Sequence, residues 1–573
     1  MKSRTTMLIG VLGLAAGSLH HSVPGSHAEG KPAATGDAVA YAERSQAARA
    51  SYAAADFAKA AVAYQTLAES NPEDGENWLR LGRSRFQLKE YRPAIEALRR
   101  ASDLGFGRLQ QNQLDIARAY AQLGDKDSAL DWLSKALHEQ RYEFRPNLEG
   151  DKAFEGLRAD PRFRQLAGLL PAREFTRDDG WRYDLDYLLV EIQRLNATYS
   201  RQPLPAPVRE AADRLRSQIP ALSDAQIAVG MQRLLALLGC SHNSLFPADG
   251  GRVKFTRLPL ACYIFPDGLY VIDGEGELKN LVGTRVVRFD DTDAAMVVRS
   301  VSALVRREND MEARWLAPSS LMSPQALHAL GLTTSPEQVR LTVSRDGRET
   351  AVMVKPGKPP AGRKLFASKV PGAPVAPMYL ENVAVAYWFN ELPEDRTVYF
   401  QFNQVMDKPD ETLPAFAKRL SRFLDEHHIQ NLVVDLRHNN GGNTYLYPEL
   451  VRTIVHFDAG SDDRKLFVLI GRNTYSAATN FVVDVERFTR AVFVGEPTGG
   501  KPNTHGDESP TVLPYSGLRF LLSCVYWQLS SPRDTRVWIA PSFPVSLSAA
   551  DYFANRDPAM EAVLELIRKA RRP

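Results

Sequence analysis

Apolar positions follow a helical spacing through the first part of the chain and then give way to short strand-like runs. Within residues 40–140, alanines recur at a period near 34, at Ala60, Ala94 and Ala129, and a bulky residue follows each of them four positions later. Small residues let two antiparallel helices approach, and bulky ones fill the space between helix pairs. The pattern predicts a block of helical repeats over residues 40–140.

A second helical segment is predicted over residues 173–248, where leucine and isoleucine recur three or four positions apart. The chain then alternates with the two-residue period of a strand, most clearly in a hairpin that turns at Asp346-Gly347. This change predicts a β module over residues 250–356 with a helical insertion at 303–335.

Two apolar runs near the C-terminal end, residues 432–434 and 466–470, each lead into a polar loop that contains glycine. Such runs are typical of buried strands that end in functional turns. A helix is expected from Ser476 to Phe488. We predict a mixed α/β core over residues 381–560, and the fold class is therefore a multidomain α/β protein.

The N-terminus resembles a signal peptide. Lys2 and Arg4 precede an apolar run of 11 residues, and small residues follow at Ser26 and Ala28. We assign residues 1–28 to this leader, which predicts a periplasmic or secreted protein.

Two further segments connect these parts. Residues 141–172 are polar and are expected to form a capping helix or a linker. Residues 357–380 are rich in proline and are expected to form a second linker.

Charge and composition exclude several classes of function. Lys and Arg number 71 and Asp and Glu number 68, which leaves a net charge of +3 and no basic stripe, so nucleic acid is not an expected partner. No run reaches 18 apolar residues, which argues against a stable membrane span. The cysteines, Cys240, Cys262 and Cys524, have neither disulfide nor zinc spacing. We expect no metal and no organic cofactor.

Ser476 is the candidate nucleophile because a turn from strand to helix lifts it to the edge of the sheet. The first amide of the helix, Ala477, and one from Gly441 or Gly442 are expected to form an oxyanion hole. The alternative is that Ser476 only caps the helix, which is the commonest role of serine at that position.

Three motifs together resemble the tail-specific, or C-terminal processing, family of serine peptidases. They are the loop Asp435–Gly442 (DLRHNNGG), the turn Thr474–Ala478 (TYSAA) and the segment Gly495–Lys501 (GEPTGGK). The resemblance implies a helical part, a PDZ-like β module and a crotonase-like mixed α/β core. It also implies a protein or peptide substrate. The period near 34 resembles tetratricopeptide repeats, which would bind a protein partner.

Two residues compete for the role of general base. Lys501 fits the Ser–Lys dyad of the processing peptidases, although His505 stands where that family usually has Gln or Glu. Ser241-His242 resembles the segment of the tricorn-type branch in which a histidine is the base and a serine orients it. That branch adds an acidic residue near the C-terminus, for which Asp534 is the nearest candidate.

We therefore expect an exported serine peptidase that forms an acyl-enzyme on Ser476. The alternative is a peptide- or ligand-binding protein on an inactive peptidase scaffold. It is suggested by His505 and by Ser542, which stands where the closing segment of the family usually has Asp. In that case the helical repeats would mediate protein interactions.

Overall fold

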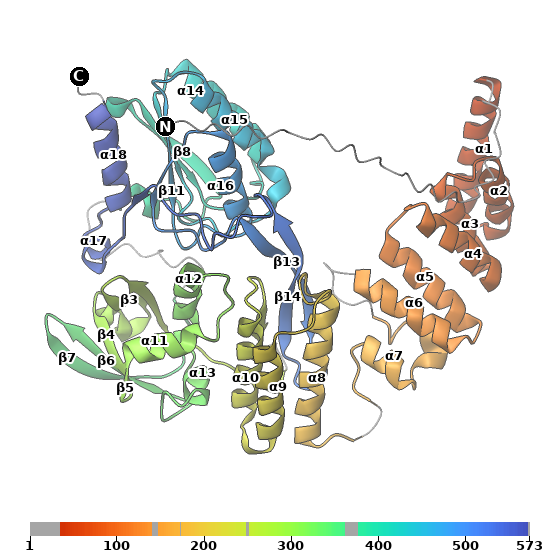
Figure 1. Cartoon of the computed structure of the whole chain (residues 1–573), viewed down its shortest axis with the longest axis horizontal. Helices are drawn as coiled ribbons and strands as arrows, with labels where there is room; N and C mark the ends of the chain where they lie inside the picture. Colours follow the sequence, from red (N-terminus) through yellow and green to blue (C-terminus); the bar gives the residue numbers. More distant parts are fainter. Residues whose placement is uncertain (1–34, 140–146, 172–173, 248–250, 361–375, 571–573) are drawn as a thin grey trace, which may run out of the picture. The chain divides into compact units, whose positions relative to one another are not determined.

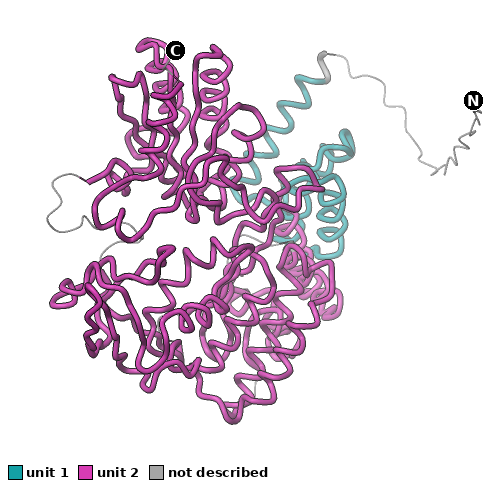
Figure 2. The backbone as a smooth tube through the Cα atoms, turned by 60° about the vertical axis from the view of Figure 1, so that its left-hand side comes forward, with its two compact units in different colours: residues 1–107 teal, residues 108–573 magenta. Residues whose placement is uncertain are grey.

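The computed structural model describes residues 35–139, 147–171, 174–247, 251–360 and 376–570. The chain divides into two compact units, residues 1–107 and 108–573 (Figure 2). The boundary falls inside the predicted repeat block, between its second and third repeats. The predicted signal peptide and most of the predicted Pro-rich linker lie outside the described residues.

The first unit consists of helices that pack as pairs. Its elements are α1 (Thr35–Ala53), α2 (Phe57–Ser70), α3 (Gly75–Gln87) and α4 (Tyr91–Asp103). The periodic alanines Ala60 and Ala94 are fully buried. A Cβ atom on Gly82 would lie 2.6 Å from Leu98 Cγ, so this small residue lets α3 approach α4 closely. The spacing of small residues thus predicted helix pairs, while the tetratricopeptide assignment stays a prediction.

The second unit begins with helices in two groups, the first three of which share one core and the last three another. They are α5 (Leu109–Gln122), α6 (Lys126–Glu139), α7 (Pro161–Leu166), α8 (Arg177–Leu195), α9 (Ala206–Gln218) and α10 (Asp224–Leu237). The third periodic alanine, Ala129, is buried between α5 and α6. The last three helices form the predicted segment at 173–248. Ser223 begins α10 with a capping box, in which its side chain and that of Gln226 bond to each other's backbone N–H.

The β module forms one sheet with the strand order β2-β3-β4-β6-β7, and β5 pairs with β4 (Figure 1). Its strands are β2 (Leu260–Phe265), β3 (Gly268–Gly274), β4 (Arg285–Phe289), β5 (Thr292–Asp293), β6 (Val339–Arg345) and β7 (Arg348–Val354). The hairpin predicted at Asp346-Gly347 is β6–β7. The predicted insertion consists of helices, because α11 (Ala294–Ser302) leads to α12 (Asp310–Leu321) and α13 (Pro324–Ala329). The PDZ-like assignment stays a prediction.

The core sheet has the order β15-β12-β11-β10-β9-β8, in which only β8 runs antiparallel to its neighbour. Its strands are β8 (Tyr387–Leu392), β9 (Thr397–Phe402), β10 (Asn431–Asp435), β11 (Lys465–Ile470), β12 (Val492–Gly495) and β15 (Phe543–Pro544). One face packs on α14 (Leu413–Glu426), α15 (Pro448–Ala459) and α16 (Ala477–Phe488). The other face packs on α18 (Pro558–Ala570), which follows α17 (Ala549–Phe553). Figure 1 shows α18 on the opposite side of the sheet from α14–α16.

A third sheet brings distant parts of the chain together. Strand β1 (Ser244–Phe246), which follows α10, pairs with β14 (Arg519–Gln528), and β14 forms a long hairpin with β13 (Asn503–Val512). This pairing places the end of the helical segment beside the hairpin that follows Lys501. Because β10 and β11 are parallel, the loops that follow them also leave from one edge of the core sheet.

Candidate active site

Ser476 stands in a strained turn between β11 and α16. Its φ is +54° and its ψ is −129°, a conformation that non-glycine residues rarely adopt. It begins the helix without a hydrogen bond from its side chain to the helix amides. The alternative that Ser476 only caps the helix therefore does not hold. Its side chain is partly exposed, within a layer of buried residues.

His242 supplies the nearest proton acceptor. It lies in the loop between α10 and β1 at a φ of +66°, and its Nε2 is 3.1 Å from Ser476 Oγ. Its ring stacks on Tyr475 with centroids 4.7 Å apart. The third sheet thus brings together two residues that are 234 positions apart.

The other ring nitrogen of His242, Nδ1, lies beside two hydroxyl groups. His242 Nδ1 lies 2.7 Å from the Tyr475 hydroxyl and 3.2 Å from Ser241 Oγ. Ser241 donates its own hydrogen to the His505 carbonyl at 2.9 Å, so toward the imidazole it can only accept. With the hydrogen on Nδ1, that nitrogen donates to Ser241 and the lone pair of Nε2 faces Ser476.

The pocket around His242 favours the neutral ring. Burial, together with the positive charge of Arg306, lowers the pKa of His242 to about 3. No carboxylate contacts this imidazole among the described residues. Arg306 itself is held by Glu312, at 3.6 Å from Nε, and by Glu508, at 3.2 Å from Nη1. At neutral pH His242 is therefore in the form that can accept a proton.

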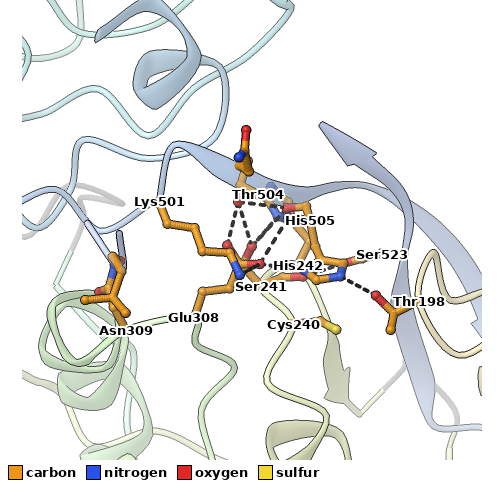
Figure 3. A network of polar contacts seen from close by, with 12 residues as sticks. Thr198, Cys240, Ser241, His242, Glu308, Asn309, Lys501, Thr504, His505 and Ser523 are labelled. Carbon is orange, nitrogen blue, oxygen red and sulfur yellow. Dashed lines mark hydrogen bonds and ion pairs between the residues drawn. The ribbon is translucent and has the colours of Figure 1, made fainter. Parts of the chain in front are cut away.

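A charged cluster lies on the far side of Ser241 (Figure 3). The fully buried carboxylate of Glu308, in the connection between α11 and α12, contacts His505 Nδ1 at 2.6 Å and Lys501 Nζ at 3.3 Å. It also accepts from Thr504 Oγ1 at 2.6 Å, and that hydroxyl is 3.5 Å from Ser241 Oγ. Although burial lowers the pKa of His505, Cys240 and Glu308 raise it to about 9.

Lys501 and Asp534, two other predicted catalytic residues, do not join Ser476 and His242. Lys501 forms an ion pair with Glu308 and has no hydrogen bond to Ser476 among the described residues. The carboxylate of Asp534 accepts from Ser530 and Arg536 instead. Its assignment as the acidic member is therefore corrected: Arg536, two residues away, engages it.

Backbone amides surround Ser476 as the glycine loop predicted. A Cβ on Gly441, whose φ is +105°, would lie 2.7 Å from Ser476 Cβ and 2.9 Å from Ala477 N, so only glycine fits against the turn. The N–H of Gly441 donates to Asn439 Oδ1 at 3.0 Å. The N–H groups of Gly442 and Ala477 have no such partner among the described residues. Of the two glycines left open by the sequence, Gly442 has the available donor.

Asp435 and Arg437 form a buried network at the start of the glycine loop. Tyr399 donates to Asp435 at 2.6 Å, and Arg437 bridges Asp435 and Asp557 with contacts of 2.6 and 2.7 Å. This buried network ties β9, β10 and α18 together beneath the glycines and does not include Ser476.

The comparison with protein families concerns the middle of the core. Residues 396–509 match peptidase family S41. This S41 segment includes Ser476, the glycine loop and Lys501, but His242 and Glu308 lie outside it. The match thus supports the assignment of the loops to a peptidase-type core.

Solved structures of CPAF share the fold. A CPAF mutant aligns with 68% of this chain and 98% of its own, with 14% sequence identity and a TM-score of 0.50. Mature CPAF complexed with lactacystin aligns with 69% of this chain and 98% of its own, also with 14% identity and a TM-score of 0.50. No curated protein matches the chain.

Sequence reasoning missed Tyr475, Thr504, Glu308, Arg306 and Glu312. Tyr475 occupied the variable position of the TYSAA turn, and the insertion that holds the last three gave no local signal. His505 was noticed only as a departure from the family pattern, whereas here it is the cation that pairs with Glu308.

Other kinds of site find no support in the part of the chain that the structure describes. It contains no group of three or more His, Cys, Asp or Glu side chains that could hold a metal ion. None of its helices combines the length and the apolar character needed to cross a membrane.

Proposed function

We propose that this protein is a serine peptidase in which Ser476 is the nucleophile and His242 the general base. The observation that carries the proposal is the 3.1 Å contact between Ser476 Oγ and His242 Nε2, beside the available N–H groups of Ala477 and Gly442. The S41 match supports peptide bonds as the target. The neutral imidazole favours His242 over Lys501, which is already paired with a carboxylate.

In the acylation step, Ser476 Oγ attacks the carbonyl carbon of a peptide bond while its proton passes to His242 Nε2. The negative charge moves to the carbonyl oxygen, where the N–H groups of Ala477 and Gly442 donate to it. His242 then returns the proton to the leaving amine, and the carbon–nitrogen bond breaks. A water molecule, deprotonated by the same imidazole, hydrolyses the acyl-enzyme.

Ser241 and Tyr475 act on the imidazole, not on the substrate. They hold Nδ1–H and so keep the lone pair of Nε2 directed at Ser476. Glu308 reaches Ser241 through Thr504 and so helps to hold the hydroxyl that faces the imidazole. Glu308 is thus the acidic member of the site that we propose in place of Asp534.

The test is hydrolysis of an unstructured protein, such as casein, by the parent and by Ser476→Ala. We expect the variant to lose at least about 10³-fold in kcat/KM, because no other hydroxyl can form the acyl-enzyme. Equal rates would end the proposal. Binding of casein without cleavage by the parent would favour the alternative of an inactive scaffold.

Three finer assignments are also proposals. Residues 1–28 direct export to the periplasm or the medium, and the helix pairs over 40–140 bind a protein partner as tetratricopeptide repeats do. The β module at 250–356 is PDZ-like and binds the tail of the substrate. The leader pattern, the buried periodic alanines and the β6–β7 hairpin support them in turn.

A further inference from the structure

A cavity of about 250 Å³ opens directly beside Ser476. Its lining includes Ser476, Gly442, Asn480, Tyr445, Asp507 and Trp527. The cavity is small compared with the pockets that hold whole drug-sized ligands, which suits a single side chain. A substrate held at the Gly442 and Ala477 amides would place a side chain next to the scissile bond at this opening.

The walls of this cavity are aromatic. Trp527 and Tyr445 approach with ring centroids 6.2 Å apart, one from β14 and the other from the loop after β10. Tyr445 is 78% exposed, which leaves most of a large ring in solvent at the mouth of the site. Gly506 makes room for Trp527, because a Cβ there would lie 2.6 Å from the indole Cδ1. Aromatic faces of this kind attract a cation or pack against a long aliphatic stem.

The charge in the cavity is a single carboxylate. Asp507, on β13, accepts from Trp527 Nε1 through Oδ2 at 2.8 Å, and its Oδ1 has no hydrogen bond or ion pair with the described residues. Burial raises the pKa of Asp507, as expected of a carboxylate with no cation beside it. Among the described residues that line the cavity there is no other charged side chain and no aliphatic one.

We propose that this cavity is a specificity pocket for a lysine or arginine side chain next to the bond that is cleaved. The proposal rests on the proposed peptidase function. The aliphatic stem of the substrate residue lies between Tyr445 and Trp527, and its charged head reaches Asp507. An acidic side chain would meet Asp507 as a like charge, and an apolar one would leave the carboxylate buried without a partner.

The test compares three peptides that differ at one position, with lysine, norleucine or glutamate. Norleucine keeps the stem of lysine and lacks its charge. We expect the parent to cleave the lysine peptide with about 10-fold higher kcat/KM than the norleucine peptide, and the glutamate peptide least. Mass spectrometry of the products identifies the cleaved bond, which should adjoin the lysine.

Asp507→Asn preserves the size of the side chain and the acceptor for Trp527. We expect it to lower the lysine-to-norleucine ratio of kcat/KM about 10-fold, while Asp410→Asn, at an exposed carboxylate before α14, leaves the ratio as in the parent. Asp507→Lys should reverse the preference toward the glutamate peptide, a gain that misfolding cannot produce. Equal cleavage of the lysine and norleucine peptides by the parent would overturn the pocket, as would an equal loss for both in Asp507→Asn.

A binding measurement tests the specificity pocket independently of the proposed peptidase function. Ser476→Ala and the double variant Ser476→Ala, Asp507→Asn are titrated with the labelled peptides and followed by fluorescence anisotropy. Selective binding of the lysine peptide that is lost in the double variant supports the pocket even if the parent cleaves nothing, in which case only the proposed function fails. Absence of both cleavage and selective binding overturns the pocket.

Discussion

The surroundings of His242 and His505 differ in one respect that sets the roles of the two side chains. Both are buried, and Ser241 lies between them, with its hydroxyl against the His242 ring and the His505 carbonyl. Burial lowers the pKa of His242 to about 3, and no carboxylate opposes it. Burial also lowers the pKa of His505, yet Cys240 and Glu308 raise it to about 9. The neighbours of each ring therefore separate a neutral proton acceptor, beside Arg306, from a cation beside Cys240 and Glu308.

The largest expected effect follows from removing the acceptor. His242→Ala should lower kcat/KM on casein about 10⁴-fold, because no other described base touches Ser476. Lys501→Ala should lower it at most about 10-fold, because Lys501 acts only through its ion pair with Glu308. Steady-state rates of both variants at pH 7 make the measurement. If Lys501→Ala is as inactive as His242→Ala, the base has been assigned to the wrong residue.

The second effect concerns stability. The pKa of folded His505, about 9, is above the unfolded value of 6.5, so its contribution is fully present below pH 6.5 and is lost as the pH rises to 9. The parent should lose about 3 kcal/mol more unfolding free energy than His505→Gln over that range. Urea unfolding at pH 6.5 and pH 9 measures the difference. Parallel losses in both proteins would show that His505 is not charged in the fold.

The smallest expected effect is that kcat/KM barely changes as the pH falls below neutral. A general base works in its deprotonated form, and with a pKa of about 3 His242 stays deprotonated down to pH 5. The value of kcat/KM for a peptide without titrating groups should stay within about twofold between pH 7 and pH 5, whereas a base of pKa 6.5 would lose roughly 30-fold. A decline centred near pH 6.5 would mean that water or a carboxylate reaches the imidazole during catalysis.

Local pattern was sufficient for the elements of the core and for the turn that holds Ser476. The helix expected from Ser476 to Phe488 is α16, which begins one residue later, and the runs at 432–434 and 466–470 lie in β10 and β11. These elements are predictable because the pattern of buried residues and the turn residues that define each of them lie close together in the sequence.

The rest of the site depends on contacts between distant segments. His242 was a candidate only through a resemblance, and nothing local relates it to a serine 234 positions away. Glu308 was missed because an acidic residue in an insertion resembles any solvated carboxylate until β13 packs against it. Asp534 was chosen by its place in the sequence, but Arg536 already engages it.

The S41 segment, residues 396–509, has a consequence for how such an activity can be inherited. It contains the proposed nucleophile and its glycines, while the proposed base comes from the loop before β1 and Glu308 from the connection before α12. Under the proposed mechanism, a gene fusion that transplanted only this segment would deliver the serine without His242, its base. The smallest transferable catalyst therefore runs from the helices before β1 to the end of the core.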